Sequence, residues 1–463
     1  MKQPLEVREV REFDRIVPRN AKNANLDGRE GYAVLPEDTF RELEAFILDY
    51  TSVKDNADAV SFFCIQSQRS VGKTICVSHY VGLIQLKSGQ QIQILPKIDF
   101  DVAAEDRTKA IFLRMLRSVK RLPAKMSGTA HLDVAHMTIY EIFIRLYVQA
   151  VGELLRKGLK SAYLRQEANL PFYKGKLVFS EHIKRNAAHQ ERFYVAFDEY
   201  HRNRAENRLI KSTLLKLQRV TGSAKTDQMI CQQLGFFEDV EPSDNYHKDF
   251  SRIVLDRSTR EYETLLEWSR VFLFDEGFTT FSGAHRARAL LFPMEKLFEA
   301  YVAKHLKRVL DRTGWRVTAQ DRGTYLFDDD PQRQLFALRP DIVLRSNDKR
   351  TIVLDTKWKR LVNQPRKNYG ISQADMYQMY VYAKKYHAPE VWLLYPQTET
   401  LREPDDFNVA ENRQGRLPSF RSKFNKAVDV TVRVFFVDVA NIDASLTRLR
   451  SLLGISVRQE EAV

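Results

Sequence analysis

Cysteine is scarce in this sequence, with only Cys64, Cys76 and Cys231 among 463 residues. They form no Cys-x-x-Cys pair and no spacing that would hold zinc. The sequence therefore excludes a disulfide-stabilised scaffold and a zinc-finger module. Because few, unpaired cysteines are typical of a reducing compartment, we expect a cytoplasmic protein.

Long apolar segments are absent as well. No stretch reaches 18 consecutive apolar residues, and the N-terminus, Met-Lys-Gln-Pro-Leu-Glu-Val-Arg-Glu-Val-Arg, lacks the apolar core of a secretory signal. The sequence therefore predicts no membrane span, no secretion and no membrane partner.

A glycine is missing where a nucleotide-binding loop needs it. The segment Val71-Gly-Lys-Thr74 has the end of a Walker A motif, but the first glycine of that motif would fall at Ser67. Without this glycine the loop cannot turn its amides toward phosphates. We expect Lys73 to be an exposed hairpin residue, and we expect no nucleotide hydrolysis by this chain.

The sequence does contain enough apolar residues to build cores, together with an excess of positive charge. Hydrophobic residues make up 44% of the chain, and its length suggests two or three domains. The net charge of +13 and the pI of about 9.4 favour a polyanionic partner. We predict an α/β chain in three parts: a β-rich region at 1–100, a mainly helical, basic region at 101–285, and at 286–463 a mixed sheet flanked by helices.

Local patterns predict the elements of the first two parts. A helix is predicted at 37–50, followed by strands over 59–98 that end in a hairpin at 82–97. The turn of this hairpin is Ser88-Gly89, and Ile92 and Ile94 alternate with Gln91 and Gln93. Further predictions are helices between 105 and 163, at 207–220 and at 262–274, an irregular stretch at 160–186 with a loop or short hairpin at 170–176, and a link at 277–283.

Residues 156–217 carry 14 lysines or arginines against 6 aspartates or glutamates. Two interpretations remain open for this region. It could be a surface that follows a nucleic-acid backbone, or a solvated basic face whose aromatic residues lie in the core. The aromatic residues interleaved with these charges are Tyr163, Phe172, Tyr173, Phe193, Tyr194 and Tyr200.

Residues 338–357 carry the clearest sign of chemistry. Two β-branched runs flank a polar turn at 346–350, which predicts a hairpin. Asp341 opens one strand and Asp355 closes the other, so pairing brings the two carboxylates together, and Lys357 shares the face of Asp355. Two convergent carboxylates can hold Mg²⁺ beside a phosphodiester, while the ammonium orients an attacking water or stabilises developing charge.

The pattern Pro-Asp, a spacer and then Asp-x-Lys resembles that of PD-(D/E)xK nucleases. A helix predicted at 371–387 places Gln378 and Tyr382 four residues apart on one face, which resembles the RecB-like branch of these enzymes. A buried strand at 390–395 is predicted to follow. The alternative interpretation is an ordinary surface hairpin, a solvated Gln378 and tyrosines that belong to the core.

A helix predicted at 293–310 supplies a further acidic residue. Glu299 is the candidate for an additional carboxylate of the site, with Glu295, one turn earlier, as its rival. Glu299 could instead form an ion pair with Lys296. After Leu401, a basic loop at 413–421 and a last strand at 430–437 are predicted.

Taken together, motifs over residues 60–400 resemble the McrC family, the nuclease subunits of McrBC modified-cytosine restriction systems. The segments that carry the resemblance are Ile94-Leu-Pro-Lys-Ile98, Arg156-Lys-Gly-Leu159 with Tyr163, Phe172-Tyr-Lys-Gly-Lys176, Glu206-Asn-Arg208, Phe292-Pro-Met-Glu-Lys-Leu-Phe-Glu299, Arg339-Pro-Asp341, Asp355-Thr-Lys-Trp358 and Asp375-Met-Tyr-Gln-Met-Tyr380.

The resemblance implies Mg²⁺-dependent cleavage of double-stranded DNA that contains modified cytosine. It also implies a partner, a hexameric McrB-like AAA+ GTPase, which the N-terminal half engages and stimulates. Asp341, Asp355 and Lys357 are carried over as catalytic, the two aspartates as metal ligands, and Gln378 and Glu299 as further candidates. Two other hypotheses are a self-sufficient repair or recombination nuclease of the same fold, and a non-catalytic adaptor of a AAA+ ring.

Overall fold

The computed structural model describes residues 7–29, 31–51, 63–86, 88, 90–96, 105–116, 118, 137–254, 260–274, 288–327, 335–362, 364–397, 419–424 and 427–456. The predicted α/β class is confirmed, since helices alternate with several mixed sheets. None of the described helices is long and apolar enough to cross a membrane.

Contacts divide the chain into two compact units. Unit 1 comprises Met1–Val7, Leu83–Gln91 and Arg121–Leu290, and unit 2 comprises Arg8–Gly82, Ile92–Lys120 and Leu291–Val463. The predicted boundaries at 100 and 285, and the predicted link at 277–283, lie outside the described residues and stay predictions.

Most of unit 1 is a helical bundle, as predicted for the middle of the chain. Its longest helix is capped at both ends: the Thr138 side chain accepts from Glu141 N–H, and Gly158, at a φ of 87°, ends the helix. A buried hydrogen bond of 2.7 Å joins Tyr147 to Ser269 across the bundle. The helices are α3 (Ile139–Lys157), α5 (Ala205–Val220), α6 (Ala224–Leu234), α7 (Tyr246–Ser251) and α8 (Glu263–Phe274), with single turns η4 (Gly235–Phe237) and η5 (Arg260–Tyr262).

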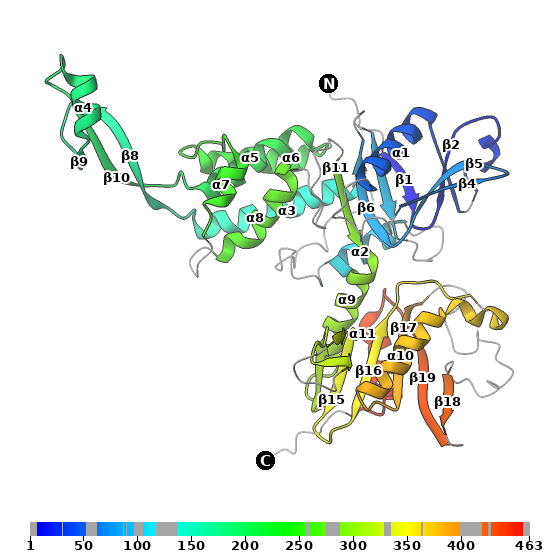
Figure 1. The fold of residues 1–463 in the computed structure, drawn as a ribbon. Coiled ribbons are helices and arrows are strands. Elements are labelled where there is room, and N and C mark those ends of the chain that lie inside the picture. The colour runs from blue at the N-terminus through cyan, green and yellow to red at the C-terminus, as the bar shows by residue number, and fades with distance from the viewer. Residues whose placement is uncertain are drawn as a thin grey trace. The chain divides into compact units, whose positions relative to one another are not determined.

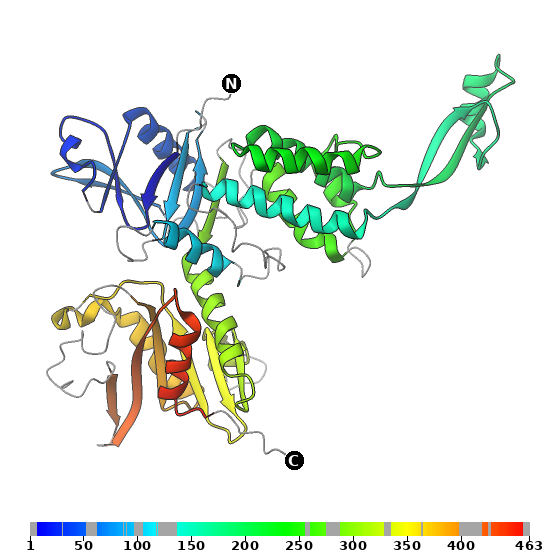
Figure 2. The same ribbon diagram turned by 180° about the vertical axis from the view of Figure 1, so that it is seen from behind.

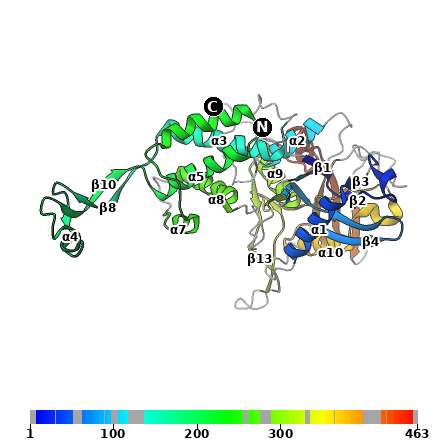
Figure 3. The same cartoon turned by 90° about the horizontal axis from the view of Figure 1, so that it is seen from above.

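A two-stranded arm extends from this bundle (Figures 1, 2 and 3). Strands β8 (Ala162–Leu170) and β10 (Phe193–His201) pair antiparallel along their whole length, and β9 (Lys176–Leu177) and α4 (Phe179–Asn186) lie at the far end. The prediction of an irregular stretch at 160–186 was therefore wrong. Among the described side chains of β8 and β10 only Val195 and Ala196 are buried, so the two strands show little apolar alternation.

The arm also tests one of the two interpretations of residues 156–217, in which the aromatic residues lie in the core. Tyr163 is 73% exposed, and Phe172, Tyr173 and Tyr200 are exposed as well. The interpretation in which the aromatic residues of this region lie in the core is wrong for these four. Phe179 and Ile183, both 68% exposed, add to the apolar surface at the tip of the arm.

Two further sheets contain the N-terminal strands. One has the order β3-β2-β5-β4 and the other β1-β7-β6-β11. The predicted helix at 37–50 and hairpin at 82–97 are both found. Their elements are β1 (Val7–Arg11), β2 (Arg15–Pro18), η1 (Ala24–Leu26), β3 (Tyr32–Leu35), α1 (Glu37–Thr51), β4 (Phe63–Gln68), β5 (Gly72–Val77), β6 (Tyr80–Gln85), β7 (Gln91–Leu95), α2 (Glu105–Leu116) and β11 (Arg288–Pro293).

Two residues of these sheets test predictions from the sequence. Lys73 is exposed and pairs with Glu44 at 2.6 Å, so the prediction that it is an exposed hairpin residue is confirmed. Gln93 departs from the expected alternation, because every residue of β7 is buried. Its amide donates to Glu9 at 2.7 Å, which satisfies the polar group inside the protein.

The C-terminal part of unit 2 is built on a six-stranded sheet of order β12-β15-β16-β17-β19-β18. The pairs β16–β17 and β17–β19 are parallel and the others are antiparallel. Its elements are α9 (Met294–Val309), β12 (Trp315–Ala319), β15 (Ile342–Ser346), β16 (Thr351–Thr356), η6 (Pro365–Gly370), α10 (Gln373–Lys385), β17 (Glu390–Pro396), β18 (Ser419–Phe424), β19 (Ala427–Val437) and α11 (Ile442–Leu452), beside the small pair β13 (Thr324–Phe327) and β14 (Leu335–Leu338).

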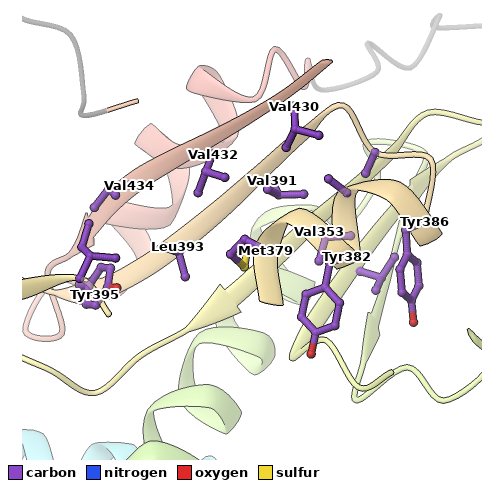
Figure 4. Packing of buried hydrophobic residues seen from close by; sticks show 14 of the residues in the cluster. Val353, Met379, Tyr382, Tyr386, Val391, Leu393, Tyr395, Val430, Val432 and Val434 are labelled. Atoms are coloured by element: carbon purple, nitrogen blue, oxygen red, sulfur yellow. The ribbon is translucent and has the colours of Figure 1, made fainter. Parts of the chain in front are cut away.

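Helix α10 packs on one face of this sheet and forms its main core. Figure 4 shows Met379 of the helix beside Val391 and Leu393 of β17, and Tyr382 of the same helix beside Val353 of β16. Each large apolar side chain buried here contributes about 1.5–3 kcal/mol. Strand β17 is buried on both faces from Val391 onward, which explains why residues 391–395 form a continuous apolar run. The predicted strands at 390–395 and 430–437 are confirmed, whereas the basic loop predicted at 413–421 lies mostly outside the described residues.

Candidate active site

The β15–β16 hairpin brings the two predicted aspartates to one end of the sheet. Ile342 pairs with Leu354, so Asp341, just before β15, lies opposite Asp355 near the end of β16. At the other end of the hairpin, Ser346 N–H donates to the Arg350 carbonyl at 2.9 Å and closes the turn. The sequence prediction of the hairpin and its turn is confirmed.

Asp341 is held by the residue that follows Asp355. Its Oδ2 accepts from Thr356 N–H at 2.7 Å and from Thr356 Oγ1 at 2.6 Å. Burial, followed by the negative charge of Glu299, raises the pKa of Asp341 to about 6, although the two Thr356 bonds oppose this rise. Sequence analysis missed Thr356; its position between Asp355 and Lys357 was the available signal.

Asp355 is only 1% exposed, and its Oδ2 lies 2.6 Å from Lys357 Nζ. Burial and then the charge of Asp341 raise the pKa of Asp355 to about 7. The neighbouring ammonium favours ionisation and does not outweigh these two causes. For Lys357, burial lowers the pKa, but the charge and hydrogen bond of Asp355 together with the charges of Asp341 and Asp375 outweigh burial, and the pKa lies above its usual value.

Helix α10 supplies the next contacts of Lys357. Lys357 Nζ donates to Gln378 Oε1 at 3.1 Å, and Gln378 Nε2 donates to Tyr382 at 2.8 Å. The interpretation of Gln378 as a merely solvated residue is therefore wrong. Tyr382 belongs both to the core and to this chain of hydrogen bonds; burial and the charge of Asp355 raise its pKa to about 12.

Asp375 is a residue of the site that sequence analysis missed. It lies one turn before Gln378 on α10, which was the available signal. One carboxylate oxygen accepts from Lys359 Nζ at 3.1 Å, and the other lies 4.0 Å from Lys357 Nζ. The N-cap Ser372 accepts from Asp375 N–H at 3.1 Å and so fixes the start of the helix.

Of the two rival glutamates, Glu299 is the one that faces the aspartates. Burial raises its pKa, and the charge of Asp355 adds to the rise, while a hydrogen bond from Gln320 opposes it. Glu295 instead lies near His79, with 3.7 Å between the carboxylate and the ring. In the alternative interpretation Glu299 pairs with Lys296, but the charge of Lys296 lowers the pKa of Glu299 only weakly.

The donor set fits a hard divalent cation held by two carboxylates. In the part of the chain that the structure describes, no group of three or more His, Cys, Asp or Glu side chains converges on one point. Mg²⁺ needs no such group, because one or two carboxylates, water and substrate phosphates complete its shell. The charge of Asp341 raises the pKa of Asp355, and a cation between the two carboxylates would relieve that repulsion.

Comparison with known proteins assigns the chain to a family. Residues 75–396 match the model of the McrBC 5-methylcytosine restriction system component. The chain belongs to this McrBC family. The matched segment includes all five residues proposed from the sequence, namely Asp341, Asp355, Lys357, Gln378 and Glu299. No curated protein matches the chain.

Solved structures give the same likeness at the level of the fold. One is a chain of a half-complex from the tetradecameric assembly of Thermococcus gammatolerans McrB AAA+ hexamers with bound McrC. It has a TM-score of 0.67 and 18% identity over 96% of this chain and 100% of that one. A chain of the McrBC complex from the same organism has a TM-score of 0.44 and 19% identity, covering 66% and 88% of the two chains.

The raised pKa values predict how stability varies with pH when no divalent cation is present. A carboxyl group whose pKa is higher in the folded than in the unfolded protein binds more protons when folded. The free energy of unfolding therefore falls as the pH rises from about 4 to about 7. Since the pKa of Asp355 is raised to about 7, Asp355→Asn should reduce this fall by about 1–3 kcal/mol.

The measurement is urea unfolding of wild type and variant from about pH 5 to about pH 8 in EDTA. Asp348→Asn, on the exposed turn of the same hairpin, is the matched control and should follow the wild type. Parallel profiles for wild type and Asp355→Asn would show that the Asp355 pKa is not raised.

Proposed function

We propose that this chain is the Mg²⁺-dependent endodeoxyribonuclease subunit of a restriction system directed against 5-methylcytosine. The observation that carries the proposal is the convergence of Asp341, Asp355 and Lys357 at the end of one hairpin, in a chain of the McrBC family. The core elements follow one another in the order β16, α10 and β17, which is the order expected of a PD-(D/E)xK nuclease.

Each residue of the site has a defined part in phosphodiester hydrolysis. Asp341 and Asp355 would hold Mg²⁺, which supplies Lewis-acid polarisation of the phosphate when bound. Lys357 stabilises negative charge that develops on the phosphorus oxygens and orients the attacking water. Gln378 keeps the Lys357 ammonium in place, and Thr356 fixes the Asp341 carboxylate.

A motor partner completes the proposed function. The loop at Lys73 has no phosphate-binding glycine and is part of a strand, so nucleotide hydrolysis falls to another protein. McrC is bound to McrB AAA+ hexamers in the related archaeal assembly. We propose an McrB-like AAA+ GTPase hexamer as partner, and modified double-stranded DNA as substrate.

The arm is the surface of unit 1 that best suits this partner. Phe172, Tyr173, Phe179 and Ile183 are exposed near its tip, where Lys174, Lys184 and Arg185 also lie. Exposed apolar groups of this size on a projecting element are typical of a protein interaction site. The proposed role of this region is to engage the GTPase and stimulate its turnover.

Two other functions are less well supported. A non-catalytic adaptor would have no need of a buried pair of carboxylates with raised pKa values, because such a pair destabilises the metal-free fold. A self-sufficient nuclease would share the site but cut DNA without any nucleotide.

Substitution of the acidic residues tests the catalytic assignment. Asp341→Ala or Asp355→Ala should lower cleavage of methylated DNA by about 10³-fold or more, because the metal ligands are lost. Lys357→Ala should have an effect of similar size through loss of charge stabilisation. Asp348→Ala, on the exposed hairpin turn, is the matched control; wild-type cleavage by any of the three site variants would refute the assignment.

Loss of Gln378 should be milder, because this residue supports Lys357 and carries no charge. Gln378→Ala is expected to slow cleavage by about 10–100-fold with little change in melting temperature. Gln373→Ala, an exposed glutamine at the start of the same helix, should leave cleavage unchanged. Equal rates for the two variants would remove Gln378 from the site.

Partner dependence separates the restriction subunit from the self-sufficient nuclease. Cutting the chain near residue 285 is unsuitable here, because Arg8–Gly82 belongs to the same unit as Leu291–Val463. The full chain should cut methylated DNA only with the AAA+ protein and GTP, and Phe179→Ser with Ile183→Ser should weaken its stimulation of GTP turnover. Leu452→Ser, an exposed leucine on α11, is the control; robust cleavage by the chain alone would exclude the restriction-subunit proposal.

A further inference from the structure

Glu12 is far from the active site in the sequence, yet it contacts the residue next to Lys357. Its side chain is fully buried, and both carboxylate oxygens accept from the indole Nε1 of Trp358, at 3.1 and 3.0 Å. Trp358 is buried as well. Burying a carboxylate is costly even when it is hydrogen-bonded. A glutamate retained at this position therefore needs an explanation beyond packing.

The backbone around Trp358 forms a tight turn that links this contact to the site. Lys359 N–H donates to the Lys357 carbonyl at 3.0 Å. Lys357 and Lys359 both reach the Asp375 carboxylate, while the indole of the residue between them bonds to Glu12. Since the three side chains leave one short turn, fixing the indole also fixes the direction of Lys357.

The same indole packs against the helix that carries Glu299. The rings of Trp358 and Phe298, which precedes Glu299 on α9, lie 5.4 Å apart. The first N–H of α9, from Met294, donates to the His79 carbonyl at 2.8 Å. Glu12 and His79 thus contact both sides of the site, one through Trp358 and the other through the start of α9.

Two of the nine non-glycine residues with positive φ in the described part of the chain meet at this junction. Phe13, next to Glu12, has a φ of 68°, and His79 has a φ of 61°. Their rings meet edge to face at 5.3 Å. Left-handed backbone is unfavourable for bulky residues, and it persists where surrounding contacts enforce it, most often at functional sites. The two residues contact each other, and one of them is the chain neighbour of Glu12.

We infer that Glu12 is a positioning residue of the nuclease site, which sets the direction of Lys357 through the hydrogen bond to Trp358. The inference rests on the proposed nuclease function. It predicts a loss in turnover and not in substrate binding, because Glu12 is fully buried and offers no surface to DNA.

The first test is cleavage of methylated DNA by the full-length chain with the AAA+ protein, GTP and Mg²⁺. Glu12→Leu should lower kcat by about 10–100-fold with KM changed less than about 3-fold. Glu12→Gln keeps an acceptor for the indole and should restore kcat to within about 3-fold of wild type. Trp358→Phe keeps the packing against Phe298 but loses the donor, so it should match Glu12→Leu, and the double variant should be no slower than either.

Asn23→Leu is the matched control. Asn23 is also fully buried in the N-terminal part of unit 2, and its amide donates to the Pro18 and Val71 carbonyls at 3.1 and 3.2 Å. This variant loses comparable buried hydrogen bonds without touching Trp358. Its melting temperature should fall while the kcat of the folded protein stays at the wild-type value.

The second test does not depend on cleavage. The chain has four tryptophans, so ¹⁵N-labelled tryptophan should give four indole N–H signals, and Trp358→Phe identifies the one from Trp358. That signal should move in Glu12→Leu and stay in place in Glu12→Gln. An unmoved signal, or wild-type kcat in Glu12→Leu, overturns the inference while the nuclease function stands. No cleavage by the wild type under any condition instead overturns the proposed function, and the positioning role falls with it.

Discussion

Two carboxylates forced to face each other inside the protein are the constraint on which this site depends. Asp341 and Asp355 lie on neighbouring antiparallel strands; burial raises the pKa of both, and the charge of Asp341 raises that of Asp355 further. Water cannot screen this repulsion at a residue that is 1% exposed. Neighbouring groups stabilise the two carboxylates. Thr356 donates two hydrogen bonds to Asp341, and the ammonium of Lys357 lies against Asp355.

Such a pair destabilises the metal-free protein, so the rest of the fold has to supply enough stabilisation to offset it. The cluster between α10 and the parallel strands buries a continuous set of valines, leucines and tyrosines directly behind the site. Tyr382 belongs both to the hydrophobic cluster and to the site, because its ring packs in the cluster while its hydroxyl accepts a hydrogen bond from Gln378. The position of Lys357 is thus linked by one glutamine to the buried core of the sheet.

Local periodicity in the sequence is enough to predict part of the site. A hairpin with a polar turn fixes which residues face each other, so the sequence alone places Asp341, Asp355 and Lys357 together, and it places Gln378 and Tyr382 on one helical face. It does not reveal Glu12, because no local pattern reports a contact across 346 positions. The arm was missed for another reason: most described side chains of β8 and β10 are exposed or half-buried, so the alternation that identifies strands is weak.

The discontinuity of the two units bears on how a motor protein could control such a site. Arg121–Leu290 carries the arm and interrupts unit 2 between its N-terminal segments and Leu291–Val463. The segments through which a motor protein controls the site therefore need not be adjacent to the site in the sequence. Apolar contacts tolerate sliding, whereas a hydrogen bond holds only over a narrow range of distance and angle. If Glu12 positions Lys357 as we infer, the buried Glu12–Trp358 hydrogen bond would transmit a small displacement of the N-terminal strands to Lys357, whereas an apolar contact there would absorb it.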